Sequence, residues 1–261
     1  MIFKQDLLSG QVAIVTGGGT GIGEVISTEL ARHGADVVVT SRNPDHHPKV
    51  IHAIRELGPR ALSVATDVRD PEQVQAMAEQ VVNSFGRIDI LINNAAGNFL
   101  CPAEQLSYNG WKAVVDIVLN GSFIASKAVL PTMKRQKRGN IVNIGATYAW
   151  SAATLVSHSG AAKAGVLNLT RTLSVEWAPY GIRVNAVTPG PIEETEGVKR
   201  LMAAPGAREA TLRKIPLRRL GSREEIAWAI LYLCSPAASY VTGHNLVVDG
   251  GLWLGMSSFG S

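Results

Sequence analysis

The 261-residue chain has few of the residues that would place it in several common classes of protein. Its two cysteines, Cys101 and Cys234, make no pattern for a metal site or a disulfide framework, and we interpret both as buried thiols in a reducing compartment. No apolar run reaches the length of about 18 residues that a membrane-spanning helix needs. With 18% charged and 46% hydrophobic residues, the composition is typical of a soluble globular protein.

The chain also lacks a strongly charged segment. Its net charge is +4 and its basic residues are scattered, so a nucleic-acid surface is not predicted, whereas an anionic small ligand is compatible. The start, MIFKQDLLSG, contains an acid and no continuous apolar core, and the end, SSFGS, does not match a peroxisomal signal. We therefore expect a cytoplasmic location and no membrane partner.

Three histidines are the only features that resemble a metal cluster. His46, His47 and His52 have no carboxylate or thiol ligand pattern beside them. We expect a solvated loop and helix face there, and no metal site.

Short Val- and Ile-rich runs alternate with longer segments of helical periodicity. The runs predict strands buried on both faces of a parallel sheet. They span residues 12–16, 36–40, 61–66, 89–93, 140–144, 182–187 and 245–250. Helices are predicted at 24–33, 50–57, 71–85, 111–134, 159–178 and 223–233. This alternation predicts an α/β protein over residues 1–261, with a single-domain Rossmann-like doubly wound sheet of about seven strands and helices on both faces. Ligands of such sheets bind at the carboxyl ends of the strands.

A glycine-rich segment, TGGGTGIG, follows the first predicted strand and opens the first predicted helix. A flexible turn is the simple alternative, but this context favours dinucleotide binding. Glycines let the backbone approach a pyrophosphate, and the helix N-terminus supplies N–H donors. The predicted cofactor-binding residues here are Thr16, Gly17, Gly19, Thr20, Gly21, Ile22 and Gly23.

The residues after the second and third strands favour NADPH over NADH. Thr40, Ser41, Arg42 and Asn43 include no acid to bind a ribose 2′-hydroxyl, whereas Arg42 and Ser41 are suitable donors to a 2′-phosphate. A solvated loop arginine is the alternative. We expect Asp67 to accept from the adenine amino group while Val68 packs on the ring. A helix cap before Pro71 is the alternative for Asp67.

Five ordered motifs resemble the short-chain dehydrogenase/reductase family. They are TGGGTGIG, NNAAG (93–97), Asn120 within DIVLNGSF, Lys163, and PGPI (189–192). The resemblance implies that Lys163 binds the nicotinamide ribose and that helices near 111–134 and 159–178 form a homotetramer. It further implies that Asn93, Ala95 and Gly97 line the cofactor and brace the central strands, and that Pro189, Gly190 and Ile192 border the nicotinamide.

The chain departs from the family at the residue that donates the catalytic proton. Ordinary members carry a Tyr one helical turn before this Lys, where this sequence has Ser159, and their upstream Ser is Ala146. A serine hydroxyl is a much weaker acid than a phenol, so a carbonyl (3-oxoacyl) reductase is disfavoured. A carbonyl reductase that uses Tyr148 as its acid remains an alternative.

Further segments resemble the 2,4-dienoyl-CoA reductase branch. They are NNAAGNFLCPAEQLS (93–107), Thr147-Tyr148, SHSGAAKAG (157–165) and VTPGPIEETEG (187–197). This resemblance implies that Asn98 and Tyr148 bind the thioester oxygen of an acyl-CoA and that Ser159 and Lys163 support them. Asn120 is expected to hold a helix kink through a backbone or water contact. Reduction of a conjugated double bond needs hydrogen-bond donors at that oxygen, where negative charge develops.

Two other functions remain open. The first is a trans-2-enoyl-CoA reductase, which is resembled just as closely by HSGAAKAGVLNLT (158–170) and SPAASYVTG (235–243). The second, from another class, is a pseudoenzyme that binds NADPH without turning over a substrate. His158 could contact substrate or simply pack. Residues 193–214 are predicted to form a substrate lid, in which Lys199, Arg200, Arg213 and Lys214 either meet CoA phosphates or are solvated.

Overall fold

The computed structural model describes residues 2–202 and 206–255, which form an α/β protein around one parallel sheet. The seven strands lie in the order β3-β2-β1-β4-β5-β6-β7. The predicted fold class is confirmed. The strands are β1 (Val12–Thr16), β2 (Asp36–Ser41), β3 (Ala61–Ala65), β4 (Ile90–Asn93), β5 (Gly139–Ile144), β6 (Ile182–Pro189) and β7 (Asn245–Val248).

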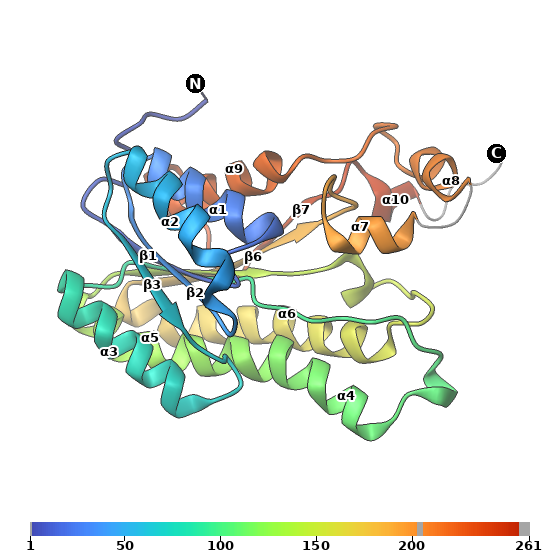
Figure 1. The fold of residues 1–261 in the computed structure, drawn as a ribbon, viewed down its shortest axis with the longest axis horizontal. Coiled ribbons are helices and arrows are strands. Elements are labelled where there is room, and N and C mark those ends of the chain that lie inside the picture. Colours follow the sequence, from blue (N-terminus) through green and yellow to red (C-terminus); the bar gives the residue numbers. More distant parts are fainter. Residues whose placement is uncertain (1, 203–205, 256–261) are drawn as a thin grey trace.

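Helices cover both faces of the sheet (Figure 1). One face carries α1 (Gly21–Arg32), α2 (His47–Glu56) and α9 (Arg223–Cys234). The opposite face carries α3 (Pro71–Phe85), α5 (Gly121–Gln136) and α6 (Ser157–Trp177), with α4 (Tyr108–Val115) leading into α5. Three shorter helices, α7 (Glu196–Leu201), α8 (Ala207–Lys214) and α10 (Leu252–Gly255), gather near the carboxyl end of β7 (Figure 1).

The strand order reverses between β1 and β4, which are neighbours near the middle of the sheet. A crevice opens at such a switch point, at the carboxyl ends of the strands. Strands β1, β4 and β5 are buried on both faces, as predicted. The two edge strands differ from that expectation, because β3 and β7 have only one neighbour each and are partly exposed.

The segment Tyr108–Gln136 forms one long helical stretch from α4 through α5. By length and composition it is apolar enough to cross a membrane, but 44% of its most apolar stretch is buried inside this fold, where it packs on α3 and α6. Core helices of globular proteins pass the same test. A π-helical turn, Asp116–Asn120, joins α4 to α5 at the place where the sequence predicts a kink.

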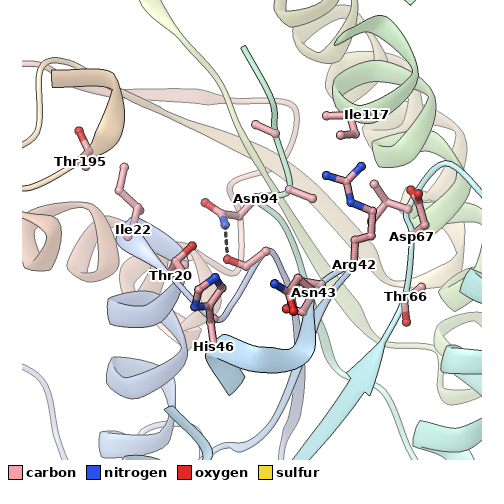
Figure 2. A pocket seen from close by; sticks show the side chains of 18 of the residues that line it. Thr20, Ile22, Arg42, Asn43, His46, Thr66, Asp67, Asn94, Ile117 and Thr195 are labelled. Carbon is pink, nitrogen blue, oxygen red and sulfur yellow. Dashed lines mark hydrogen bonds between the residues drawn. The ribbon is translucent and has the colours of Figure 1, made fainter. Parts of the chain in front are cut away.

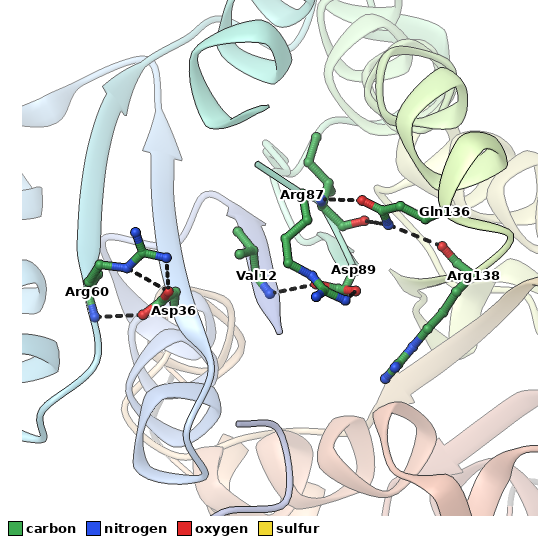
Figure 3. Close-up of polar contacts among 8 residues, drawn as sticks. Val12, Asp36, Arg60, Arg87, Asp89, Gln136 and Arg138 are labelled. Carbon is green, nitrogen blue, oxygen red and sulfur yellow. Dashed lines mark hydrogen bonds and ion pairs between the residues drawn. The ribbon is translucent and has the colours of Figure 1, made fainter. Parts of the chain in front are cut away.

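Ion pairs fix the amino ends of the strands (Figure 3). The Asp89 carboxylate accepts the Val12 N–H at 2.9 Å and two bonds from Arg87, each 2.7 Å long. At the neighbouring strand, Arg60 donates to Asp36 at 2.6 Å. These contacts hold β1 in line with β4, and β2 in line with β3, at the amino ends of the strands.

Candidate active site

A cleft of about 800 Å³ lies at the carboxyl ends of β1, β2, β3 and β4 (Figure 2). Eleven of the predicted cofactor residues line it: Gly17, Gly19, Thr20, Gly21, Ile22, Gly23, Ser41, Arg42, Asp67, Val68 and Ala95. The sequence prediction missed nine more lining residues: Asn43, His46, Thr66, Asn94, Ala96, Ile117, Glu194, Thr195 and Arg223.

The glycine segment between β1 and α1 is shaped for close approach of a ligand. Gly17 and Gly21 have φ of +64° and +56°, in the left-handed region that favours glycine. A Cβ on Gly23 would lie 2.1 Å from the Gly17 carbonyl oxygen, so only glycine fits there. The loop is tied to β4 by Asn94, whose amide donates to the carbonyl oxygens of Thr16 and Gly17 at 3.0 and 3.1 Å.

Thr16 lies beneath the cleft and not on its surface. Its hydroxyl donates to the Ile92 carbonyl oxygen at 3.2 Å and accepts the N–H groups of Asn94 and Ala95, each at 3.0 Å. The residue holds β1 and β4 together where a dinucleotide would cross the sheet. Asn94 follows Asn93 in the NNAAG motif, which was the available signal for its role.

Arg42 reaches from the end of β2 into the cleft, beside Asp67 and Ile117 (Figure 2). Within residues 2–202 and 206–255, no carboxylate or hydrogen-bond acceptor pairs with its guanidinium. Ser41 lines the same part of the cleft, but its hydroxyl already donates to the Asn43 carbonyl oxygen at 2.8 Å. The charge of Arg42 contributes to the lowered pKa of the nearby Asp67, but Arg69 makes the hydrogen bonds to that carboxylate, so the Arg42 guanidinium can donate to an anionic ligand.

Asp67 lines the cleft, and its carboxylate also binds a neighbouring arginine. Arg69 donates to both carboxylate oxygens, at 2.9 Å and 2.5 Å. These hydrogen bonds hold the pKa of Asp67 below its usual range. The alternative of a helix cap is wrong, because Asp70 caps α3 by accepting the N–H groups of Glu72 and Gln73. Val68 is 7% exposed and packs against Gly121 at the cleft wall.

Four predicted cofactor residues contact the scaffold and not this cleft. Asn93 is 4% exposed, and its amide donates to Asn143 Oδ1 at 2.8 Å, which braces β4 against β5. Gly190 backs onto Asp249, and Pro189 pairs with Val248 in β7. The Ile192 side chain is 2% exposed within the core. A fifth predicted cofactor residue, Gly97, also does not line the cleft and lies against Ile117.

Tyr148, Ser159 and Lys163 form one cluster, although they come from two elements. Tyr148 lies in the 3₁₀ turn Thr147–Ala149 after β5, and its Oη lies 3.2 Å from Ser159 Oγ on α6. Lys163 follows one turn later on α6, is 6% exposed and donates from Nζ to the Ile144 carbonyl oxygen at 2.5 Å. Burial lowers the pKa of Lys163 to about 8. A phenol thus lies close to the helical position that lacks one.

The structure does not bring Asn120 into this cluster. Its side chain is exposed, and its amide donates to the Asp116 carboxylate at 2.8 Å, whereas the sequence predicted a contact to a backbone group or to water. The π-helical turn explains the difference, because it presents Val118 to α6 instead. Asn98 lies exposed on the loop after β4, where its Oδ1 accepts the Phe99 N–H at 2.9 Å.

Histidine 158 is enclosed beside the cluster. His158 is 0% exposed, and its ring stacks on Phe99 with centroids 4.6 Å apart. Burial lowers the pKa of His158, and a backbone contact with Phe99 partly opposes that shift. Phe99 lies between this ring and solvent, which favours packing over the substrate contact left open by the sequence.

Two expectations about reactive side chains are corrected. His47 is 1% exposed and not solvated, because its ring lies between β2 and β3. Cys101 is only partly buried, whereas Cys234 is buried, which raises the pKa of its thiol to about 12. Across residues 2–202 and 206–255, no group of three His, Cys, Asp or Glu side chains could hold a metal ion.

The predicted lid begins at an anchored hinge. Glu193 donates its N–H to the Gly221 carbonyl oxygen at 2.9 Å, and Glu194 forms an ion pair with Arg223 at the start of α9. Glu194 and Arg223 line the cleft but are 29 positions apart, which concealed the pair from sequence analysis. Lys199, Arg213 and Lys214 are exposed, and the side chain of Arg200 lies outside the described residues.

Comparison with known proteins agrees with this fold and cleft. A family model described as "Enoyl-(Acyl carrier protein) reductase" matches residues 17–253. A short-chain dehydrogenase from Bacillus anthracis, with a solved crystal structure, is 47% identical with a TM-score of 0.85; the match covers 93% of this chain and 96% of that one. The chain therefore belongs to the short-chain dehydrogenase/reductase family.

Within the family, several similar relatives are named as 2,4-dienoyl-CoA reductases. A "Peroxisomal 2,4-dienoyl-CoA reductase [(3E)-enoyl-CoA-producing]" from Danio rerio is 48% identical, over 97% of this chain and 85% of the relative. A "Probable 2,4-dienoyl-CoA reductase [(2E)-enoyl-CoA-producing]" from Bacillus subtilis is 47% identical, over 94% of this chain and 97% of the relative. A gluconate 5-dehydrogenase from Burkholderia cenocepacia, solved with NADP and tartrate, is 31% identical over 95% and 97% of the two chains, with a TM-score of 0.90.

Proposed function

We propose that this protein reduces a conjugated carbon–carbon double bond of an unsaturated acyl-CoA with NADPH, and that the substrate is a 2,4-dienoyl-CoA. The observation that carries the proposal is the contact between Tyr148 Oη and Ser159 Oγ, one helical turn before the buried Lys163. This arrangement supplies a hydrogen-bond donor without the helical Tyr of a carbonyl reductase. The names of relatives that are 41–48% identical support the same activity.

The residues of the cleft fit a dinucleotide with a 2′-phosphate. The glycine segment can pack this tightly only without side chains, because a Cβ on Gly23 would strike the Gly17 carbonyl oxygen and a Cβ on Gly17 would crowd Ala95. The tight turn leads directly into the N-terminus of α1, whose N–H groups suit a pyrophosphate. Arg42 is the cation for the 2′-phosphate, and no acid at the end of β2 repels it. The NADP bound by the Burkholderia cenocepacia relative supports this choice. When bound, NADPH supplies the hydride for the reaction.

Tyr148 binds the thioester oxygen in this mechanism. Hydride adds to the far carbon of the diene, the π electrons shift toward the thioester, and negative charge collects on its oxygen. The Tyr148 phenol donates to that oxygen, and the buried Ser159 hydroxyl fixes where the phenol lies. Asn98, on the loop after β4, is the second donor that we assign to the oxygen.

Lys163 acts through its charge and position. Its Nζ is held by the Ile144 carbonyl oxygen at the end of β5, next to the turn that carries Tyr148. Since its pKa is about 8, Lys163 is mostly protonated at neutral pH. A buried cation there can donate to the ribose hydroxyls of the cofactor and stabilises the negative charge of the enolate. Asn120 contacts neither residue, and we assign it only to the shape of the π-helical turn.

The position of the product double bond depends on which carbon of the dienolate takes a proton from water. Protonation at the α carbon gives a 3-enoyl product, and protonation at the γ carbon gives a 2-enoyl product. The two relatives' names print different products. Analysis of the product by NMR therefore belongs in the same experiment.

One assay tests the function. Oxidation of NADPH is followed in parallel with 2,4-hexadienoyl-CoA, trans-2-hexenoyl-CoA and acetoacetyl-CoA. We expect turnover of the dienoyl thioester to exceed that of the other two by at least about tenfold. Turnover of acetoacetyl-CoA alone would instead identify a carbonyl reductase, and NADPH binding without any turnover would identify a pseudoenzyme.

A trans-2-enoyl-CoA reductase is the second candidate. The matched family model is described by reduction of enoyl groups, and the oxyanion chemistry would be the same. A higher kcat/KM for trans-2-hexenoyl-CoA than for the dienoyl thioester would favour it.

Three further proposals concern the lid, the assembly and the location. We infer that residues 193–214, of which 203–205 lie outside the described residues, close over the substrate within a single-domain chain, because Glu194 and Thr195 at the start of this segment line the cleft. We infer a homotetramer through α5 and α6, whose exposed Phe123 and Val175 would be covered. We also propose a cytoplasmic location. The lid is tested by whether acyl-CoA protects this segment from proteolytic cleavage, and the tetramer by the mass measured in light scattering. The location is tested by cell fractionation, and recovery of the protein in a peroxisomal fraction would overturn it.

A further inference from the structure

The ring of His47, the first residue of α2, is enclosed at the end of the nucleotide cleft. His47 is 1% exposed, whereas His52, one turn later in the same helix, is exposed to solvent. Its Nδ1 lies 2.7 Å from Ser63 Oγ on β3, and its Nε2 lies 2.7 Å from Ser41 Oγ on β2. A buried histidine with a hydroxyl at each nitrogen has a defined orientation.

The hydrogen bonds run in one direction. The Ser41 hydroxyl has a single hydrogen, and it donates that hydrogen to the Asn43 carbonyl oxygen at 2.8 Å. Ser41 Oγ must therefore accept from His47, so that Nε2 carries a hydrogen. Burial lowers the pKa of His47, and in the neutral ring Nδ1 accepts from Ser63. The chain thus runs from Ser63 through His47 and Ser41 to Asn43.

The same ring lies against the phosphate-binding loop. A Cβ on Gly19 would lie 2.9 Å from His47 Cδ2, so the edge of the ring packs directly on this glycine. Gly19, Ser41 and Arg42 all line the cleft. His47 therefore joins the two loops that would meet the pyrophosphate and the 2′-phosphate.

We propose that His47 is a positioning residue for NADPH: it holds the Ser41 hydroxyl beside Arg42, where that hydroxyl can turn its hydrogen from Asn43 to the 2′-phosphate. The inference rests on the proposed NADPH cofactor. With the His47 Nε2–H bond in place, Ser41 Oγ stays fixed while its hydrogen changes acceptor. Without it, the hydroxyl is free to rotate away, and discrimination between NADPH and NADH falls.

Direct binding of two probes tests the role without any turnover. Dissociation constants of adenosine 2′,5′-bisphosphate and of AMP are measured by calorimetry, and those of NADPH and NADH by cofactor fluorescence. His47→Phe keeps a ring under Gly19 and removes both nitrogens. We expect it to weaken the bisphosphate and NADPH about fivefold more than AMP and NADH, as loss of one hydrogen bond does.

Two companion variants make the result specific. Ser63→Ala leaves the His47 ring in place and removes only the group that orders it, and we expect a shift of about threefold in the same ratio. His52→Phe, the same substitution on the exposed side of α2, leaves the ratio unchanged. If His47→Phe does not fold, Ser63→Ala alone decides the question.

Equal weakening of both probes by His47→Phe, or an unchanged ratio in Ser63→Ala, would overturn the inference. If the wild-type protein binds AMP as tightly as it binds the bisphosphate, the NADPH assignment and this inference are both overturned. Neither result depends on the dienoyl substrate, so the reductase activity remains a separate test.

Discussion

Replacing Tyr148 by Phe removes one oxygen atom from the site and keeps the ring that packs in the turn Thr147–Ala149. The lost group is the phenol whose Oη lies 3.2 Å from Ser159 Oγ. If that phenol donates to the thioester oxygen, its bond strengthens as charge develops there. Loss of one such donor lowers kcat by roughly 10²- to 10³-fold, or about 3–4 kcal/mol of transition-state stabilisation.

The effect on folding should be far smaller than the effect on kcat. Tyr148 is only partly buried, and Ser159 is the one side chain that its hydroxyl contacts among the described residues. Loss of one such hydrogen bond costs about 1 kcal/mol. The variant should therefore stay folded and bind NADPH with unchanged affinity, so that a fall in kcat reports chemistry.

The assay is the initial rate of NADPH oxidation over a range of 2,4-hexadienoyl-CoA concentrations, with kcat and KM fitted separately. Tyr240→Phe is the matched control, because that side chain is fully exposed near the amino ends of the strands. Ser159→Ala keeps the phenol but removes its partner, and we expect a fall of about five- to tenfold. A kcat within threefold of wild type for Tyr148→Phe would remove the phenol from the mechanism.

Three other variants test the cofactor, the lysine and the scaffold. Arg42→Ala should raise KM for NADPH at least about tenfold and leave KM for NADH within twofold; equal changes would contradict the phosphate contact. Lys163→Met should exceed wild type in stability below pH 8, where protonating the buried amine costs the folded state, by up to about 3 kcal/mol. That advantage should shrink as pH rises from 8 to 10.5, the ordinary pKa of a lysine amine, and urea titrations at several pH values measure it. Glu225, in the capping box with Ser222, has its pKa lowered to about 2 by Arg219 and Ser222, so Glu225→Gln should lose about 1 kcal/mol at pH 7. This difference should vanish as pH falls from 4.5 toward 2, and a constant difference would refute the assignment.

Much of the fold followed from local pattern. The predicted strand VAIVT and the predicted helix at 71–85 coincide with β1 and α3. A continuous β-branched run suits a strand buried on both faces, and a helical period of apolar residues suits a helix buried on one face. The edge strands β3 and β7 departed from the pattern. Exposure of an edge is a property of strand order, which no single run of residues encodes.

The site was predictable where motif and element coincide. The glycine segment and Arg42 sit at strand ends, so strand–helix alternation alone placed them in one cleft. Asp67 and Asn120 behaved differently because partners within four residues, Arg69 and Asp116, engaged them first. His47 was mistaken for a solvated residue because its partners lie on two neighbouring strands.

The packing of α6 explains how an acid from another element can serve this site. Gly160 directly follows Ser159, and a Cβ there would lie 3.3 Å from the Tyr148 carbonyl oxygen. The turn Thr147–Ala149 can therefore rest directly on the first turn of α6. A Cβ at 160 would require that turn to shift by a few tenths of an ångström, which would disturb the 3.2 Å contact between the phenol and Ser159. The small residue at 160 thus lets a donor from the end of β5 lie next to the helical position that lacks a Tyr, while Lys163 keeps its place on the helix; under the proposed mechanism that donor is the one that reaches the thioester oxygen.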